Sequence, residues 1–213
     1  MGKRKRIGLD FDNTIVGYDE LFATLALEQG MLTRVSEGGK PAIRENLRSK
    51  GEQGELEWQR LQSLAYGARI GEAKLIEGVA PFILSCRRRN CELFIVSHKT
   101  RYAGMDPGGV NLRRAALDWM SARNFFDEAG LGFKRTDIYF AGTRFEKIER
   151  IRLLRCDLFI DDLIEVFTNP AFPTDVEAVL FSPGPGFDRK ASSGVKRVAA
   201  FVSWKDIAGH VFK

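Results

Sequence analysis

The sequence predicts an α/β fold, a Rossmann-like doubly wound parallel sheet with a small helical domain inserted after the first strand. Three features carry this prediction. Short apolar runs recur along the chain. Helical spacing of apolar residues separates most of these runs, and strands that alternate with helices indicate a parallel sheet covered on both faces. The third feature is the segment 17–77, which has helical periodicity and contains no convincing strand.

The strands are expected at the apolar runs, because short runs bounded by turn residues are typical of buried strands. These runs are residues 7–9, 93–96, 138–140, 158–160, 178–181 and 198–202. Helices are expected at residues 80–89, 111–123, 147–154 and 162–168. Ligands of such open sheets bind outside the carboxyl ends of the strands, so functional residues are expected there.

The inserted segment carries two apolar stripes with helical spacing. They are Tyr18, Leu21, Phe22, Leu25 and Leu32, and Trp58, Leu61, Leu64, Ala65 and Ala68. Between them, residues 36–54 are rich in glycine, lysine and charge, and we expect a loop with one short helix around residues 43–48. The predicted domains are a core of residues 1–16 and 78–213 and a helical domain of residues 17–77. The alternative is that these helices belong to the core of a larger sheet.

The composition describes a chain long enough to bury a full core, with 213 residues of which 44% are hydrophobic. No run of about 18 apolar residues is present, so no membrane span is expected. The basic start lacks a signal-peptide apolar region and the three cysteines form no CxxC pair, which favours reduced thiols and a cytoplasmic location. Two histidines exclude a His-rich metal site. The net charge of +5 suits anionic partners, but without a nucleic-acid-binding motif nucleic acid is not expected as a partner.

The most informative segment is Ile7–Val16, an apolar run followed by Asp10, Asp12 and the pair Asn-Thr. Residues i and i+2 of an extended strand project to the same side. Two carboxylates placed together repel each other and lose water, which a hard divalent cation between them makes tolerable. The segment therefore indicates a metal site, and the alternative is an acidic turn.

Three later segments place polar residues at strand ends or near a helix start. They contain Ser97-His98-Lys99, Lys147, and Asp161-Asp162. Thr143 is the predicted N-cap of the helix that carries Lys147, and Glu146 stands in the capping-box position three residues later. Each residue alone is typical of a cap or a solvated side chain, so the order of the four segments is the informative feature.

In this order the four segments resemble the four motifs of the haloacid dehalogenase-like (HAD) hydrolase superfamily. The first segment is similar to motif I, an apolar strand followed by Asp-x-Asp-x-Thr. The insertion directly after it is similar to the helical C1-type cap of many members, which implies that residues 17–77 form a cap. Dehalogenases of the superfamily lack the second Asp and its ion pumps carry Thr there, so Asp12 implies a phosphatase or a phosphomutase.

The resemblance also implies catalytic roles. Asp10 would be the nucleophile that forms an aspartyl-phosphate intermediate. Asp12 would protonate the leaving oxygen and then deprotonate the water that breaks the intermediate. Lys147 would neutralise the nucleophile and the transferring group, and Ser97 would donate a hydrogen bond to a phosphoryl oxygen. His98 is a further candidate for substrate contact.

The cofactor implied by the resemblance is Mg²⁺. Its ligands would be Asp10, the backbone carbonyl of Asp12, and the acids that end the fourth segment. Of these acids we favour Asp162 as the direct ligand and Asp161 as its outer-shell partner.

The function expected from these residues is a magnesium-dependent phosphatase that hydrolyses a small phosphorylated metabolite. Sugar phosphates and nucleoside monophosphates both fit a cap of this size. The alternatives are a sugar phosphomutase, a nucleic-acid end phosphatase, and a non-catalytic phosphate-binding module. No residue pattern in the cap names the substrate.

Overall fold

The computed structural model describes residues 3–34, 38–104, 109–183 and 198–213. Residues 36 and 37 of the predicted charged loop lie outside the described residues. The chain divides into two compact units. The sheet unit consists of Met1–Ile15, Leu75–Lys99 and Asn124–Lys213, and the helical unit consists of Val16–Lys74 and Thr100–Arg123.

The sheet unit contains a six-stranded parallel sheet with the strand order β5-β4-β1-β6-β7-β8. Its strands are β1 (Arg6–Leu9), β4 (Glu92–His98), β5 (Ile138–Ala141), β6 (Leu158–Asp161), β7 (Glu177–Phe181) and β8 (Val198–Phe201). Each predicted strand is present at its expected place in the sequence. The α/β parallel-sheet prediction is therefore confirmed.

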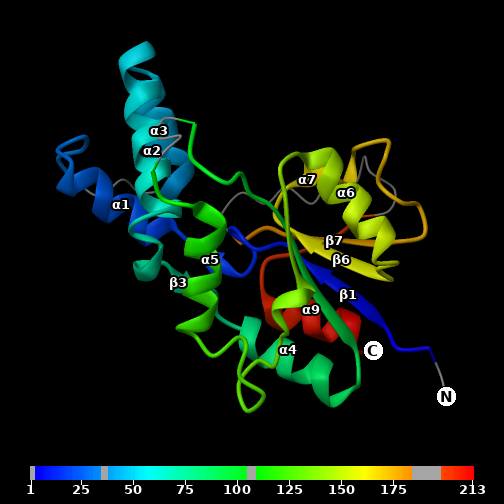
Figure 1. Ribbon diagram of the computed structural model, residues 1–213. Coiled ribbons are helices and arrows are strands. Elements are labelled where there is room, and N and C mark those ends of the chain that lie inside the picture. The colour runs from blue at the N-terminus through cyan, green and yellow to red at the C-terminus, as the bar shows by residue number, and fades with distance from the viewer. Residues whose placement is uncertain (1–2, 35–37, 105–108, 184–197) are drawn as a thin grey trace. The chain divides into compact units, whose positions relative to one another are not determined.

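Helices cover both faces of this sheet. Figure 1 shows α4 (Val79–Arg88) and α9 (Trp204–Val211) on one face, and α6 (Arg144–Leu153) and α7 (Ile164–Phe167) on the other. The short 3-10 helix η2 (Arg135–Asp137) leads into β5. Helix α9 was not predicted from the sequence. Its N-cap is Ser203, whose hydroxyl accepts a hydrogen bond from the backbone N–H of Asp206 at 3.1 Å.

The strand order identifies where this fold binds ligands. From β1 the chain passes outward through β4 to β5, and then returns to β6 on the other side of β1 before continuing to β7 and β8. The junction of β1 and β6 is therefore the topological switch point, outside which open α/β sheets bind ligands. Leu9 is paired with Ile160, so the next residue of each strand, Asp10 and Asp161, lie level at this junction.

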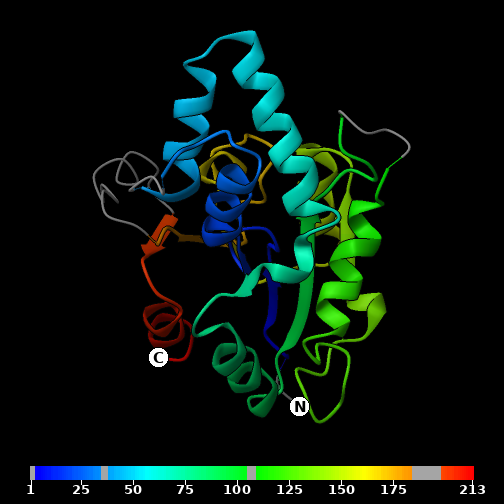
Figure 2. The same cartoon turned by 90° about the vertical axis from the view of Figure 1, so that its left-hand side faces the viewer.

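The helical unit contains most of the inserted segment. Its elements are β2 (Val16–Gly17), α1 (Asp19–Glu28), α2 (Gly39–Arg48), α3 (Glu52–Tyr66), the 3-10 helix η1 (Ile70–Glu72), β3 (Lys74–Leu75, whose second residue falls in the sheet unit) and α5 (Leu112–Ser121). Strands β2 and β3 form a two-stranded sheet. Figure 2 shows α2 and α3 as an antiparallel pair joined by a short turn.

The short helix expected around residues 43–48 is present, but among the described residues more of the segment 38–54 is helical than predicted. Helix α2 spans Gly39–Arg48 and α3 begins at Glu52. The physical reason is that Ile43 and Leu47, one helical turn apart, are fully buried, while most of the charged side chains of α2 face away from this stripe. High charge is compatible with a helix when one stripe is apolar.

Close packing of α2 against α3 depends on Gly54. A Cβ atom at this position would lie 1.7 Å from the backbone oxygen of Leu47, so a larger residue cannot occupy it without moving the helices apart. The remaining core is aromatic, with Phe22 stacked on Trp58 at 5.1 Å between ring centroids. The helical unit therefore has a packed core of its own.

Residues 100–123 come after β4 in the sequence but are part of the helical unit. The indole N–H of Trp119 on α5 donates to the backbone oxygen of Ala73 at 2.9 Å, and the guanidinium of Arg123 donates to the oxygens of Gly71 and Ala73. The helical unit is thus built from two separate chain segments. That residues 17–77 act as a cap stays a prediction.

Within the described part of the chain, no helix combines the length and the apolar character that crossing a membrane requires.

Candidate active site at the carboxyl ends of β1, β4 and β6

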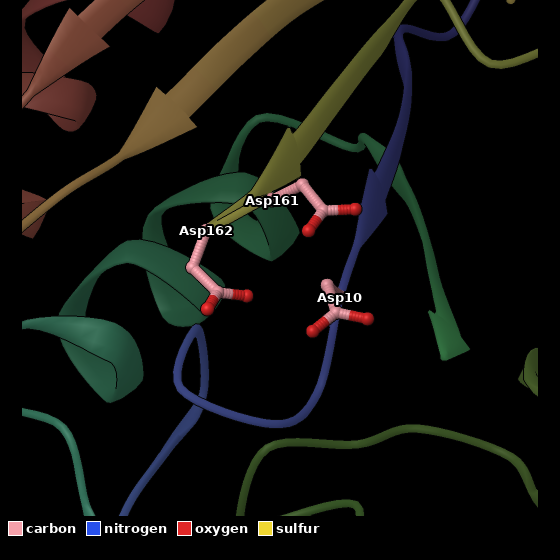
Figure 3. A group of neighbouring side chains, drawn as sticks. All are labelled: Asp10, Asp161 and Asp162. Carbon is pink, nitrogen blue, oxygen red and sulfur yellow. The ribbon is translucent and has the colours of Figure 1, made fainter. Parts of the chain in front are cut away.

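Three of the predicted acids meet at the switch point. Asp10 follows β1 and is held level with β6 by a backbone hydrogen bond from its N–H to the oxygen of Ile160, at 2.8 Å. Asp161 is the last residue of β6 and Asp162 follows it. One carboxylate oxygen of each acid lies within 4.8 Å of the others. Figure 3 shows the three carboxylates converging at the ends of the two strands.

Lys147 of α6 contacts two of these acids. Its ammonium nitrogen lies 2.6 Å from Oδ1 of Asp10 and 2.7 Å from Oδ2 of Asp161, and all three side chains are buried. Burial alone lowers the pKa of Lys147, but the two carboxylates together raise it above its usual value. Lys147 therefore carries its charge at neutral pH.

The start of α6 places Lys147 one turn into the helix. The Thr143 hydroxyl accepts a hydrogen bond from the backbone N–H of Glu146 at 3.1 Å, as the sequence predicted. The Glu146 carboxylate returns to the backbone N–H of Gly142 at 2.7 Å, one residue earlier than a capping box requires. These contacts attach the helix start directly to the end of β5.

Asp161 and Asp162 have different partners. Oδ1 of Asp161 accepts a hydrogen bond from the backbone N–H of Leu163 at 3.0 Å, while its Oδ2 is ion-paired with Lys147. Asp162 is half-buried, and its Oδ1 receives a long contact of 3.4 Å from the hydroxyl of Thr14. Asp161 thus accepts a backbone hydrogen bond on Oδ1, while its buried Oδ2 has an ion pair but no hydrogen bond among the described residues.

The electrostatics of this group favour a divalent cation. Burial raises the pKa of Asp10 well above its usual value, and the neighbouring acids add to this rise while Lys147 opposes it. With the Lys99–Asp12 pair described below, four carboxyl groups face two ammonium groups. Carboxylate oxygens are the ligands that hard divalent cations prefer. The residues present therefore fit a metal such as Mg²⁺.

Ser97 is the sixth residue of β4 and is buried. Its hydroxyl has no hydrogen-bond partner among the residues that the structure describes. Burying a polar group without a hydrogen-bond partner destabilises the folded state relative to burying a paired one. This hydroxyl is therefore available to a ligand at the strand ends.

His98 and Lys99 lie in different surroundings, because side chains of a strand alternate between its two faces. The His98 ring is exposed, and its Nε2 lies 3.1 Å from the backbone oxygen of Gly142. The Lys99 side chain is buried on the same side as Ser97, and its Nζ lies 2.8 Å from Oδ2 and 3.0 Å from Oδ1 of Asp12. Of these two residues, Lys99 and not His98 contacts an acid of the segment that follows β1.

From the sequence, Lys99 is a residue that could contact substrate together with His98, or an exposed loop residue, and its contact with Asp12 is not predicted. The available signal was the alternation of β4, which places residues 97 and 99 on one face if the strand continues past Ser97. The apolar run ends at Val96, so the sequence alone did not show that the extended backbone continues. The structure brings Asp10, Asp161, Asp162 and Lys147 together; the roles assigned to these residues and to Asp12, Ser97 and His98 stay predictions.

Several solved structures with a similar fold are described as HAD hydrolases, and one as a predicted phosphatase. A predicted phosphatase from Clostridium acetobutylicum has a TM-score of 0.62 and 11% identity, covering 99% of this chain and 99% of that chain. A family IA HAD hydrolase from Entamoeba histolytica has a TM-score of 0.58 and 11% identity, covering 95% and 94%. A HAD family hydrolase from Deinococcus radiodurans, solved with bound phosphate and sodium, has a TM-score of 0.54 and 12% identity, covering 96% and 93%.

No protein-family model matches the chain, and no curated protein matches it. At these identities the structural likeness concerns the fold, and nearly the whole of each chain is covered.

Proposed function

We propose that this chain, which has the fold of the HAD-superfamily hydrolases, is a magnesium-dependent phosphatase. It hydrolyses a small phosphomonoester through an aspartyl-phosphate intermediate. The observation that carries this proposal is the buried carboxylate of Asp10, held against Lys147 within a group of three acids at the switch point. The fold relatives agree, since one is described as a predicted phosphatase and another holds phosphate.

Asp10 is the proposed nucleophile. Because Lys147 binds Oδ1 of Asp10, we assign the attack on phosphorus to Oδ2. A bond forms between this oxygen and phosphorus, and the bond from phosphorus to the leaving oxygen breaks. Asp12 donates its proton to the leaving oxygen, which departs as an alcohol.

The second step regenerates the enzyme. Asp12, now a carboxylate, takes a proton from a water molecule whose oxygen attacks phosphorus. The bond between phosphorus and Asp10 breaks and inorganic phosphate leaves. During both steps Lys147 neutralises charge on the transferring group. The hydroxyl of Ser97, which has no partner within the described ranges, donates to a phosphoryl oxygen.

Mg²⁺ would be held by Asp10, by Asp162 and by the backbone carbonyl of Asp12. We favour Asp162 over Asp161 as direct ligand because Asp161 already accepts a backbone hydrogen bond on Oδ1 and is ion-paired with Lys147 through Oδ2. The bound ion would supply positive charge where negative charge develops on the transferring phosphoryl group.

The substrate class is a small phosphorylated metabolite, with the helical segment 17–77 proposed as the cap that selects it. The cytoplasmic location expected from the cysteines stays a prediction. A screen of sugar phosphates and nucleoside monophosphates with detection of free phosphate identifies the substrate. Products that keep the phosphoryl group would instead indicate a phosphomutase.

The decisive experiment replaces the nucleophile. Asp10→Asn keeps the side-chain shape but removes the attacking carboxylate, so turnover of p-nitrophenyl phosphate should fall by roughly a thousandfold or more. Asp157→Asn is the matched control, because Asp157 directly precedes β6, at the other end of the strand from Asp161, and pairs with Lys3. EDTA should abolish activity and Mg²⁺ should restore it, while Ca²⁺ supports turnover poorly.

Full activity of Asp10→Asn, or of the wild type in excess EDTA, would rule out this mechanism. Wild-type protein that binds phosphate but releases none from any substrate would identify the non-catalytic module. Fluoroberyllate, which mimics a phosphoryl group on a carboxylate, should inhibit the wild type and not bind the Asp10→Asn variant.

A further inference from the structure

Lys99 is a buried cation that the proposed chemistry leaves without a role. It follows β4, and its backbone N–H donates to the oxygen of Ala141 at 2.9 Å, which extends the ladder between β4 and β5 by one bond. Its side chain is 3% exposed. A lysine is almost never this buried unless it is paired, so the pairing is the feature to explain.

Lys99 forms an ion pair with Asp12. The ammonium nitrogen contacts both carboxylate oxygens, at 2.8 and 3.0 Å, and it also lies 5.6 Å from the ring centre of Phe11. The Asp12 side chain is 21% exposed, so one side of this pair remains open to solvent. Lys99 therefore holds Asp12 in one orientation without enclosing it.

The orientation of Asp12 is informative. Although Asp12 is only two residues from Asp10, its carboxylate is not part of the group formed by Asp10, Asp161 and Asp162 within the described ranges. A carboxylate that joined this group would add negative charge there and would become a further ligand for a divalent cation. It would then be unable to exchange a proton with a leaving oxygen.

We propose that Lys99 is a positioning residue that holds the Asp12 carboxylate apart from the three-acid group, where it can exchange a proton with the leaving oxygen and with the attacking water. This inference rests on the proposed function. Lys99 acts through Asp12 and does not contact the substrate. Its effect should therefore appear only in steps that require proton transfer by Asp12.

The test compares leaving groups. Alkyl phosphates need a proton on the departing oxygen, whereas p-nitrophenol departs as its anion without one. Lys99→Met keeps the length of the side chain and removes the charge. It should lower kcat for alkyl phosphates at least about tenfold, within the roughly 10²- to 10⁴-fold that general acid–base catalysis contributes. KM should stay near the wild-type value, and Lys205→Met, on the exposed side of α9, should leave both constants unchanged.

p-Nitrophenyl phosphate separates the two steps. In Lys99→Met the first step should stay fast while hydrolysis of the intermediate, which needs Asp12 as base, becomes slow. Rapid mixing should then give a burst of p-nitrophenolate equal to the enzyme concentration, followed by slow turnover. A Lys99→Arg variant, which keeps the charge, should recover part of the lost rate.

A double-mutant cycle decides whether Lys99 acts through Asp12. In an Asp12→Asn background, adding Lys99→Met should change kcat less than twofold, because the group that Lys99 positions is already gone. An undiminished further loss, or a KM that rises equally for all substrates, would overturn the inference and make Lys99 a substrate-binding residue. An equal loss of kcat for both leaving groups without a burst would overturn it in favour of a structural role.

These results can be told apart from failure of the proposed function. If the wild type hydrolyses no phosphomonoester, the phosphatase proposal fails. If the wild type is active and Lys99→Met matches it on alkyl phosphates, only the inference about Lys99 fails.

Discussion

Removing the ammonium group of Lys147 should destabilise the sheet unit by an amount that the geometry sets. Lys147→Met breaks two ion pairs, of 2.6 and 2.7 Å, in which every side chain is at most 5% exposed. Breaking a buried pair from one side costs about 3–5 kcal/mol, because the remaining charge stays buried without compensation. For a chain of this size that corresponds to a fall in Tm of about 6–20 °C.

The matched control is Lys3→Met. The pair Lys3–Asp157 has the same separation, 2.6 Å, but its side chains are 74% and 31% exposed. Exposed pairs contribute less than about 1 kcal/mol, so the Tm of this variant should stay within a few degrees of the wild type. The comparison isolates burial as the cause.

The loss in Lys147→Met should also depend on pH. The folded-state pKa of Asp10 is already raised above the usual 3.8, and removing Lys147 raises it further. A carboxyl group with a raised pKa in the folded state destabilises that state increasingly as pH rises from the unfolded pKa towards the folded one. The variant should therefore be closest to the wild type near pH 4 and fall behind it as pH increases.

Thermal unfolding followed by far-UV circular dichroism, at several pH values and without added metal, measures these effects. Adding Mg²⁺ at neutral pH should return part of the lost stability, because a bound cation replaces the missing positive charge. A fall in Tm no larger than that of Lys3→Met, or one that is the same at pH 5 and pH 8, would show that the buried pairs do not carry the energy assigned to them.

Three further predictions concern separate parts of the chain. Asp162→Ala should raise the half-saturating Mg²⁺ concentration for activity more than Asp161→Ala does, and the reverse order in a metal titration would exchange their roles. Burial raises the pKa of the Cys156 thiol to about 12, and it also raises the pKa of each of the other two cysteines. Iodoacetamide at pH 8 should therefore label the native protein far more slowly than the denatured protein, which mass spectrometry can measure. Gly54→Ala should destabilise the helical unit by about 1–3 kcal/mol through its clash with α2. Gly209→Ala in α9, where a Cβ meets no atom of the described residues within 4 Å, should stabilise the protein by up to about 1 kcal/mol, and equal denaturation midpoints for the two variants would contradict this.

The parallel sheet could be predicted from the sequence because strands buried on both faces are continuous apolar runs. The runs at β1 and β6 lead directly into acids, and parallel strands bring their carboxyl ends to one edge. The meeting of Asp10 with Asp161 follows from these two facts once the strands are neighbours. The two residues are far apart in the sequence, but the strand order brings them together because β1 and β6 are neighbours in the sheet.

Other features depend on information that local patterns do not carry. Helix α2 has a largely hydrophilic sequence, and the burial of Ile43 and Leu47 against other helices is a contribution to its stability that the local pattern does not show. In the sequence, Lys99 resembles a solvated loop residue. In the structure its backbone N–H donates to the oxygen of Ala141, which continues the hydrogen bonding of β4 past its apolar run. The placement of α5 in the helical unit depends on contacts with Gly71 and Ala73, which lie far earlier in the chain.

The route of the chain through the two units has a consequence for how the protein is made. The chain passes from one unit to the other four times, after Ile15, Lys74, Lys99 and Arg123. During synthesis the helical unit has all of its residues once Arg123 is added, when only β1 and β4 of the six-stranded sheet exist. The residues of the helical unit are therefore complete before β5, β6, β7 and β8 are synthesised. If residues 17–77 alone were exchanged between related proteins, Trp119 would lose the native segment that carries its hydrogen-bond partner Ala73. A segment exchanged as a whole should therefore include residues 100–123.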